Sequence, residues 1–524
     1  MLTNRTTTSA RPTSPDSALT PVPWWPVLGL SGVLVTLLLA LSARHGYHLD
    51  ELYTRVAGRH LSWAQIDQPP LPAFVAWLET TLFGDTLVAF RLVPALTVAG
   101  VVVLACLIAR ELGGGRRAQV LATAAAAGSG LIFHTGHMLG TNTFDLPAWV
   151  AVCWLAIRLA RTENPRLWFA IGAVVGLGLY AKYLIALLLI ALAVGLLLCG
   201  PRRLLLSRYP VFAAVIAVVL PAPVLVWQMT HGWPQFEMAA AISKALENLA
   251  VVSFLPFLVL LIGLFLVPVW IAGLIGLLRR PQWRQYRFVG VAFPVMIALL
   301  LVTGVGSNYA SGLQFVLLAA GCVVVEGWSR TVTLRSLVTA AVAANTVTSA
   351  VLALPVLPLD VYAGNPVLEQ LSIGQLDQAA WPELAAQAAA VYRSLPAEER
   401  AHTVFYGNHY GQAGALDKYG PEYGLPQAYS GHNSYADFGV PSEDKTVVIA
   451  IGVDRTVFAG LFASCEPHGK FQVDLPVDDR GQEFLVCRGP REPWSQIWPK
   501  LRWIGFQCPY TTKPVTAKSE TGCE

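Results

Sequence analysis

The sequence predicts an α-helical membrane protein with about eleven transmembrane helices, followed by a soluble extracytoplasmic α/β domain. Two observations support this fold class. The 524-residue chain is 55% hydrophobic and only 13% charged, and its mean hydropathy is +0.53, which is far more apolar than an average soluble protein. The composition then changes near residue 358, where polar residues, tyrosine and glycine become frequent. We therefore divide the chain into a membrane part, 24–357, and a soluble domain, 358–524.

The N-terminal region predicts a short tail and a first membrane helix. Residues 1–23 are rich in Thr, Ser and Pro, which indicates a disordered cytosolic tail. The apolar run at 25–41 ends in Leu41-Ser42-Ala43, which also resembles a signal-peptidase site. We interpret the run as a retained anchor, because it is long and follows a long polar segment, and cleavage is the alternative. Both readings place residue 50 on the same side of the membrane.

Further apolar runs predict the remaining spans. They lie near 87–109, 118–133, 143–160, 168–181, 183–199, 210–228, 251–278, 288–303, 310–327 and 336–357. Arginines gather in alternate loops, which the positive-inside rule assigns to the cytosol. The extracytoplasmic set is then 43–86, 134–142, the turn near Lys182, 229–250, 304–309 and everything after about 358.

The first extracytoplasmic loop, 43–86, carries an adjacent acidic pair, Asp50 and Glu51, directly after the first span. Two amphipathic helices are expected in this loop, at 51–63 and 71–83, separated by a pair of prolines. Ionisable groups at a membrane face are costly and usually functional. A carboxylate there can act as a general base that removes a proton from an acceptor hydroxyl as this attacks a sugar carbon.

Two cations are placed to steady a departing phosphate. Lys182 lies between apolar runs, and Arg91 lies at the outer end of the second span. Either side chain could bind phosphate at the level of the lipid headgroups. Snorkelling of a long cationic side chain toward the interface is the alternative for each.

Several motifs together resemble bacterial relatives of glycosyltransferase family 39. This group includes protein O-mannosyltransferases and lipid A aminoarabinose transferases and has the GT-C fold. The resemblance covers most of residues 44–330 and rests on the stretches 50–53, 58–61, 67–71, 90–94, 109–114, 178–183 and 227–234. It implies a membrane glycosyltransferase that transfers a sugar, with inversion, from a polyprenyl-phosphate donor to an envelope lipid, glycan or protein.

The resemblance also implies roles for individual residues. Asp50 matches the catalytic acidic residue of the family's first loop, and Glu51 and Asp145 are further catalytic candidates. The donor-phosphate candidates are Lys182, Arg91 and Arg59. A divalent metal or substrate contact is an open alternative for Asp67 with His231 or Glu237. Where many relatives read Thr-Asp-Pro-Phe-Asp, this chain reads Thr141-Asn142-Thr143-Phe144-Asp145, which puts a two-acid mechanism in doubt.

The C-terminal domain combines short β-rich runs with helical segments. Its stretches 406–408, 411–416 and 429–435 resemble those of actinobacterial members, and their Tyr, Asn, His and Gly residues fit either a sugar-contacting surface or an ordinary loop-rich fold. Four of the eight cysteines lie in this domain. Cys465 and Cys487 flank short strands, so they are the expected disulfide if the domain is exported.

Two other function classes compete with the enzyme. A transporter or flippase of a lipid-linked sugar would place polar residues deep in several helices, and the apolar runs contain almost no ionisable residues at mid-depth. A non-catalytic scaffold would not gather acids and cations on one face. Nucleic-acid binding is excluded, because the net charge is only +4 and no basic cluster alternates with aromatic residues.

Overall fold

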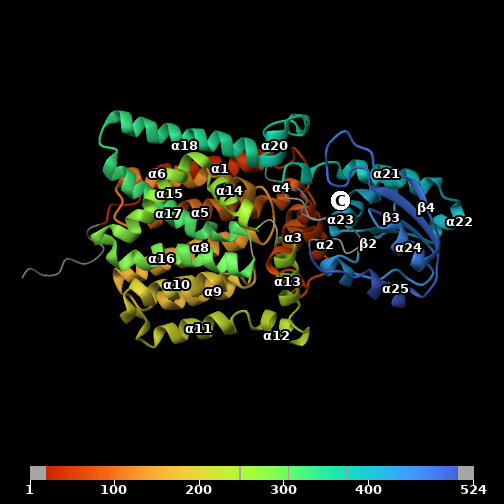
Figure 1. Ribbon diagram of the computed structural model, residues 1–524, viewed down its shortest axis with the longest axis horizontal. Helices are drawn as coiled ribbons and strands as arrows, with labels where there is room; N and C mark the ends of the chain where they lie inside the picture. The colour runs from red at the N-terminus through yellow and green to blue at the C-terminus, as the bar shows by residue number, and fades with distance from the viewer. Residues whose placement is uncertain (1–18, 247–249, 305, 373, 506–524) are drawn as a thin grey trace, which may run out of the picture.

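The computed structural model describes residues 19–246, 250–304, 306–372 and 374–505. The predicted tail at 1–23 lies almost wholly outside the described residues, as do Cys508 and Cys523. Figure 1 shows a long helical bundle with a smaller α/β domain at one end.

The helical part begins at Trp24 and ends at Ala353. Its helices are α1 (Trp24–Leu41), α2 (Leu49–Ala57), α3 (Leu71–Phe83), α4 (Leu87–Phe90), α5 (Leu92–Glu111), α6 (Arg116–Ala127), α7 (Gly130–Gly136), α8 (Asn142–Thr162), α9 (Leu167–Gly178), α10 (Ile185–Cys199), α11 (Tyr209–Val219), α12 (Ala222–Thr230), α13 (Pro234–Leu246), α14 (Ala250–Ile262), α15 (Val267–Arg279), α16 (Arg287–Thr303), α17 (Ser311–Trp328) and α18 (Val332–Ala353).

Several of these helices are long and apolar enough to cross a bilayer. Among the described residues there are 6 such helices, or up to 8 if two bent pairs each count as one span. The bends lie between α11 and α12, at 57°, and between α14 and α15, at 90°. Shorter apolar helices at Leu71–Phe83, Leu167–Gly178 and Ile185–Cys199 add to the bundle. The polytopic fold class is confirmed, whereas the count of eleven spans stays a prediction.

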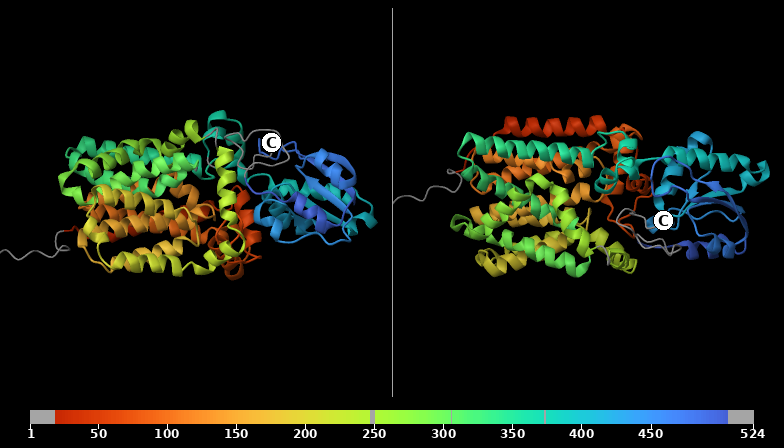
Figure 2. Two further views of the ribbon diagram at one scale, coloured as in Figure 1. Left: turned by 60° about the horizontal axis from the view of Figure 1, so that its bottom comes forward. Right: turned by 45° about the horizontal axis from the view of Figure 1, so that its top comes forward.

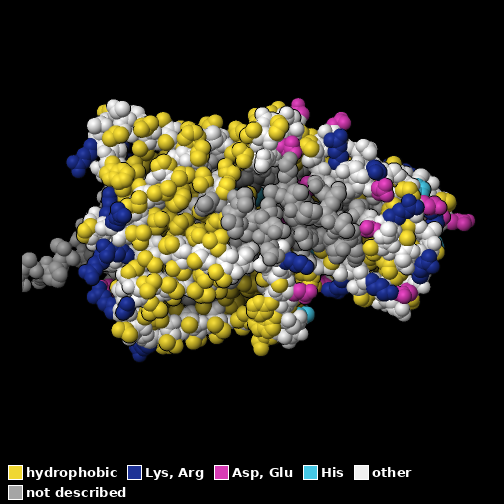
Figure 3. All heavy atoms as spheres, in the orientation of Figure 1, with side chains coloured by type: hydrophobic (Ala, Val, Ile, Leu, Met, Phe, Trp, Pro, Cys, Tyr) yellow, Lys and Arg dark blue, Asp and Glu magenta, His cyan; other side chains and the backbone are white. Residues whose placement is uncertain are grey.

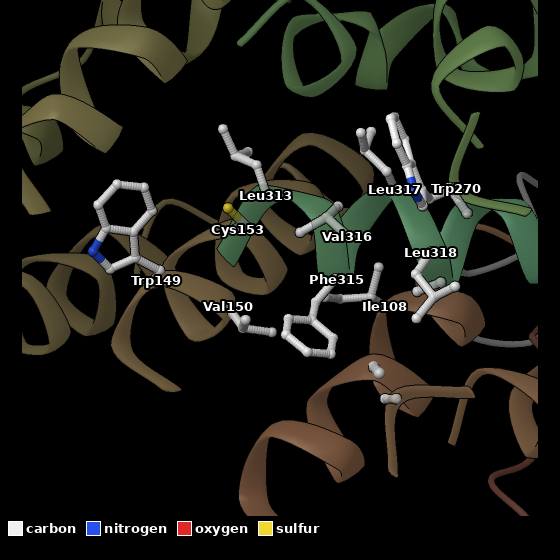
Figure 4. Packing of buried hydrophobic residues seen from close by; sticks show 14 of the residues in the cluster. Ile108, Trp149, Val150, Cys153, Trp270, Leu313, Phe315, Val316, Leu317 and Leu318 are labelled. Atoms are coloured by element: carbon white, nitrogen blue, oxygen red, sulfur yellow. The ribbon is translucent and has the colours of Figure 1, made fainter. Parts of the chain in front are cut away.

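The bundle packs around α17, which is the most deeply buried of the long apolar helices. Phe315, Leu317 and Leu318 of α17 lie among side chains of α5, α8 and α15, as Figure 4 shows. Gly321 lets α17 approach α15 closely, because a Cβ there would lie 1.9 Å from the Val269 carbonyl oxygen. Small residues at helix contacts are typical of membrane bundles, where close packing replaces the hydrophobic driving force.

The C-terminal part is an α/β domain with one five-stranded sheet. Its strands are β1 (Thr403–Gly407), β2 (Ala428–Tyr429), β3 (Val447–Ile451), β4 (Phe462–Lys470) and β5 (Glu483–Pro490), and its helices are α19 (Leu359–Ala363), α20 (Pro366–Leu371), α21 (Trp381–Ser394), α22 (Ala397–Ala401), α23 (Tyr410–Tyr419), α24 (Arg455–Leu461) and α25 (Trp494–Leu501). The strand order is β2-β1-β3-β5-β4; β1 is parallel to β2 and β3, and β5 is antiparallel to β3 and β4.

The strands β1 and β3 are buried on both faces along their whole length, which explains their continuous apolar sequences, whereas the edge strand β4 is largely exposed. Phe405 and Ile449 face the layer formed by α21 and α23, whereas Val404 and Val448 face α24 and α25. The α21–α23 core does not stop at the domain boundary, because Leu52 of α2 belongs to the same cluster. The loop at 43–86 and the α/β domain therefore share one hydrophobic core.

Charged side chains are distributed unevenly along the length of the bundle (Figure 3). In Figure 3, hydrophobic side chains cover the visible side of the helical part, and Lys and Arg gather at the end remote from the sheet domain. Figure 2 shows the sheet domain at the opposite end from two further directions. This arrangement agrees with the alternation of arginine-rich loops in the sequence.

Candidate active site

The acidic pair lies in the first turn of α2, at the junction of the bundle with the α/β domain. His48 caps this helix: its Nδ1 accepts a hydrogen bond from the Asp50 amide, while Glu51 reaches back to the His48 amide. This reciprocal capping fixes where the helix begins. Adjacent helical side chains diverge by about 100°, so Asp50 and Glu51 face different surroundings.

Glu51 is fully buried and pairs with Arg91. The Glu51 Oε1 accepts from Arg91 Nε at 2.9 Å, and Oε2 accepts from Nη2 at 2.5 Å. The amides of His48 and Leu139 also donate to this carboxylate. Because Glu51 has 0% exposure and both oxygens are engaged, the geometry does not support the catalytic role expected for it.

Arg91 is equally enclosed. Besides Glu51, its two terminal nitrogens donate to the carbonyl oxygens of Ser42 and Gly46 and to His137 Nε2. Burial and the Arg91 charge hold the pKa of His137 well below its usual range, so the neutral ring can accept this bond. All five N–H groups of the guanidinium are thus occupied. The expected phosphate role of Arg91 is not supported, since no donor remains for a phosphate.

Asp50 has a different environment. The phenol of Tyr410, the first residue of α23, donates to Asp50 Oδ1 at 2.7 Å. The Asp50 side chain retains 39% exposure, and its Oδ2 lies 4.0 Å from His48 Nδ1, beyond hydrogen-bond distance. Among the described residues, Oδ2 accepts no hydrogen bond. One carboxylate oxygen is therefore held, and the other is open to receive a proton.

A second carboxylate lies nearby on the same loop. Tyr53 donates to Asp67 Oδ1 at 2.7 Å, and Asp50 is close enough to act on Asp67 electrostatically. Burial raises the pKa of Asp67 to about 6, although the hydrogen bond from Tyr53 acts in the opposite direction. Asp67 is thus half-ionised near pH 6, unlike an ordinary aspartate.

Lys182 is half-buried and lies beside the first turn of α8. Its Nζ donates to Asn142 Oδ1 at 3.0 Å and lies 4.3 Å from the ring centre of Tyr309. Asn142, Asp145 and Tyr309 line a small pocket, together with apolar side chains of α7 and α8. Asp145 accepts from Trp149 Nε1 at 2.8 Å and interacts electrostatically with Lys182. Lys182 and Asp145 are therefore brought together, with Asn142 at the position of the expected first acid.

Other expected site residues do not converge. Arg59 is exposed near the end of α2. His231 is exposed and stacks on Trp227, with the ring centres 4.0 Å apart, and Glu237 is exposed on α13. In the described part of the chain, no group of three or more His, Cys, Asp or Glu side chains could hold a metal ion. The structure does not assemble the expected metal group of Asp67 with His231 or Glu237.

The expected cysteine pair is joined in the structure. Cys465 of β4 lies directly opposite Cys487 of β5, and a disulfide links them. The cysteines at 106, 153, 199 and 322 are free thiols in the bundle.

Comparison with known proteins identifies the fold. Residues 67–227 match the family model of dolichyl-phosphate-mannose-protein mannosyltransferase, and no curated protein sequence matches. ArnT from Cupriavidus metallidurans bound to undecaprenyl phosphate superposes with a TM-score of 0.60 at 14% identity, covering 89% of this chain and 98% of ArnT. The chain has the GT-C fold.

Two further structures agree with this GT-C assignment. Apo ArnT gives a TM-score of 0.56 at 15% identity, over 88% of this chain and 98% of ArnT. The arabinofuranosyltransferase AftD from Mycobacteria gives 0.53 at 14% identity, over 91% of this chain and 40% of AftD. The family model and these neighbours are glycosyltransferases, which supports the predicted enzyme class. The matched family segment begins after Asp50, so the role of Asp50 rests on its geometry and on the motif resemblance.

Sequence reasoning missed Tyr410, Tyr53 and Tyr309. Tyr410 lies between the two motif stretches 406–408 and 411–416, and no spacing rule links it to a carboxylate 360 residues away. Tyr53 was part of the acidic motif, and Tyr309 belongs to an expected extracytoplasmic loop. Only the folded chain brings their rings to the charged groups.

Proposed function

We propose that this protein transfers a sugar from a polyprenyl-phosphate-linked donor to a cell-envelope acceptor on the extracytoplasmic face of the membrane. The observation that carries the proposal is the Asp50 carboxylate, which is held at Oδ1 and open at Oδ2. It lies where a lipid-embedded bundle meets a soluble domain. Asp50 is the general base in this proposal.

The reaction is a single displacement. The acceptor oxygen attacks the anomeric carbon of the donor, the bond between that carbon and the phosphate oxygen breaks, and the polyprenyl phosphate leaves with the electron pair. The acceptor proton passes to Asp50 Oδ2. Attack from the side opposite the leaving group inverts the configuration at the transferred carbon.

Lys182 is the proposed contact for the donor phosphate. It is a half-buried cation beside Asn142, where a charge-assisted hydrogen bond to a leaving phosphate is strong. The segment 139–142 connects the surroundings of Asp50 with those of Lys182. The Leu139 amide donates to Glu51, the neighbour of Asp50, and the Asn142 side chain accepts from Lys182. ArnT, which shares the fold, is known bound to undecaprenyl phosphate. That ligand supports a polyprenyl carrier for this chain.

The proposed topology places the N-terminus in the cytosol and the domain from residue 358 outside. The gathering of Lys and Arg at the far end of the bundle supports this orientation. The Cys465–Cys487 disulfide supports it independently, because disulfides persist in oxidising compartments.

The test is product analysis with purified, reconstituted protein. A panel of polyprenyl-phosphate sugars is supplied together with envelope acceptors, and free polyprenyl phosphate is measured by mass spectrometry. Release that depends on the acceptor, with an inverted anomeric linkage in the product by NMR, is the expected result. Movement of intact lipid-linked sugar across the bilayer without any release would instead indicate a flippase.

A further inference from the structure

The α/β domain contacts the proposed base through the side chain of Tyr410. Its hydroxyl donates to Asp50 Oδ1 at 2.7 Å, and the residue is only 7% exposed. Short hydrogen bonds to a charged carboxylate are about twice as strong as neutral ones. Tyr410 is therefore able to fix the plane of the Asp50 carboxylate.

The Tyr410 ring is itself held in an aromatic stack that crosses the junction. On one side lies Tyr53 of α2, with ring centres 4.6 Å apart and planes inclined by 24°. On the other side lies His432, at 4.5 Å and 14°, and His432 stacks on Trp503 at 3.7 Å. The stack leaves the phenol little freedom to turn away from Asp50.

His432 completes the support of Tyr410. Its Nδ1 accepts a hydrogen bond from the Tyr410 amide at 3.3 Å, and its Nε2 lies 2.7 Å from the Gly505 carbonyl oxygen. Burial holds the pKa of His432 well below its usual range. The neutral ring with its proton on Nε2 satisfies both bonds, so the start of α23 is anchored.

The approach of α23 to α2 depends on two glycines. A Cβ at Gly414 would lie 3.0 Å from the Leu52 Cβ, and one at Gly411 would lie 3.1 Å from the Leu49 Cβ. Larger residues at either position would push the helices apart. The chain thus has small residues where Tyr410 must come within reach of Asp50.

We propose that Tyr410 is a positioning residue for the Asp50 base, and that the α/β domain completes the active site by supplying it. This inference rests on the proposed function. Tyr410 keeps its own proton throughout; its hydrogen bond holds Oδ1 so that Oδ2 faces the acceptor hydroxyl and takes its proton. Without this bond the carboxylate can rotate, and fewer encounters have the reactive geometry.

The test is a double-mutant cycle between Tyr410→Phe and Asp50→Asn in the full-length, reconstituted protein. Phenylalanine keeps the ring in the stack but cannot donate a hydrogen bond. Tyr410→Phe alone is expected to lower kcat about tenfold, with KM for the donor within about twofold of wild type. In the Asp50→Asn background it should cause no further loss, because a residue that acts through Asp50 has nothing left to position.

The matched control is Tyr435→Phe. Tyr435 is a buried tyrosine of the same domain, and its hydroxyl donates to Asp417 at 3.4 Å. This variant should keep wild-type kcat. As a second variant, 3-fluorotyrosine at position 410 retains both ring and hydroxyl and should restore kcat. Loss of activity with fluorotyrosine as well would assign the effect to packing and overturn the inference.

The outcomes separate this inference from the proposed function. An equal loss from Tyr410→Phe in both backgrounds, or no loss in the wild-type background, overturns the positioning role while the Asp50 assignment stands. Full activity of Asp50→Asn alone overturns the proposed base, and with it any need to position it.

Discussion

The buried pair of Glu51 and Arg91 gives the prediction that differs most from expectation on sequence alone. Arg91→Ala removes a guanidinium that is 1% exposed and leaves Glu51 buried without its partner. Breaking such a pair from one side costs about 3–5 kcal/mol. The carbonyl oxygens of Ser42 and Gly46 lose a donor as well. The thermal midpoint of unfolding should therefore fall by about 6 °C or more.

The assay is thermal unfolding of the purified protein in detergent, measured beside donor binding. Glu51→Gln should also lower the midpoint, and the double variant should lose less than the two single variants together, because they share one interaction. Arg59→Ala, an exposed arginine near the same helix, is the control and should unfold like wild type. If Arg91→Ala kept the wild-type midpoint but lost affinity for the donor, Arg91 would be a phosphate ligand and the structural assignment would be refuted.

Three further predictions concern other parts of the site. Lys182→Ala should raise KM for the polyprenyl-phosphate donor about tenfold, since one charge-assisted hydrogen bond is lost. Arg284→Ala changes an exposed arginine remote from Lys182 and should leave this KM unchanged. Equal KM values for the two variants would refute the assignment of Lys182 as a phosphate contact. Burial raises the pKa of Asp67 from its ordinary value of 3.8 to about 6, so the folded state holds this proton more tightly and stability should fall as pH rises from about 4 to about 6. Asp67→Asn should flatten this part of the melting-temperature profile, and an unchanged slope would count against the raised pKa. Gly414→Ala should loosen the contact of α23 with α2 and speed tryptic release of the α/β domain, because the added Cβ would meet Leu52. Gly460→Ala, whose added Cβ would have no atom within 4 Å, should be digested like wild type. Identical digestion of the two variants would contradict close packing of α23 on α2.

The fold class could be read from the sequence because it depends on bulk properties. Apolar runs indicate which segments contact lipid, and alternating arginine clusters indicate which loops are expected on the cytosolic side of the membrane. Neither inference requires knowledge of how the helices pack. The number of spans could not be fixed in this way. Hydropathy registers 251–278 as one run, whereas the structure bends this segment by 90° at Gly263.

The site was harder to predict because it depends on contacts between distant residues. The motif places Asp50 and Glu51 side by side, and their spacing alone cannot tell which faces inward. That choice is set by Arg91, whose guanidinium encloses Glu51. Likewise, Arg91 has the charge of a phosphate ligand. Only the folded chain shows that its N–H groups already donate to the carbonyl oxygens of Ser42 and Gly46. Tyr410 belongs to a different domain, so no local pattern could connect it with Asp50.

The most direct test of the central claim is the turnover of purified Asp50→Asn with a lipid-linked sugar donor. Asparagine keeps the size of the side chain and can still accept the hydrogen bond from Tyr410, but it cannot take a proton. We expect kcat to fall about 100-fold or more, with an unchanged thermal midpoint. Asp360→Asn, which alters an exposed acidic residue of α19, should keep full turnover. Wild-type turnover by Asp50→Asn would contradict the assignment of Asp50 as the catalytic base.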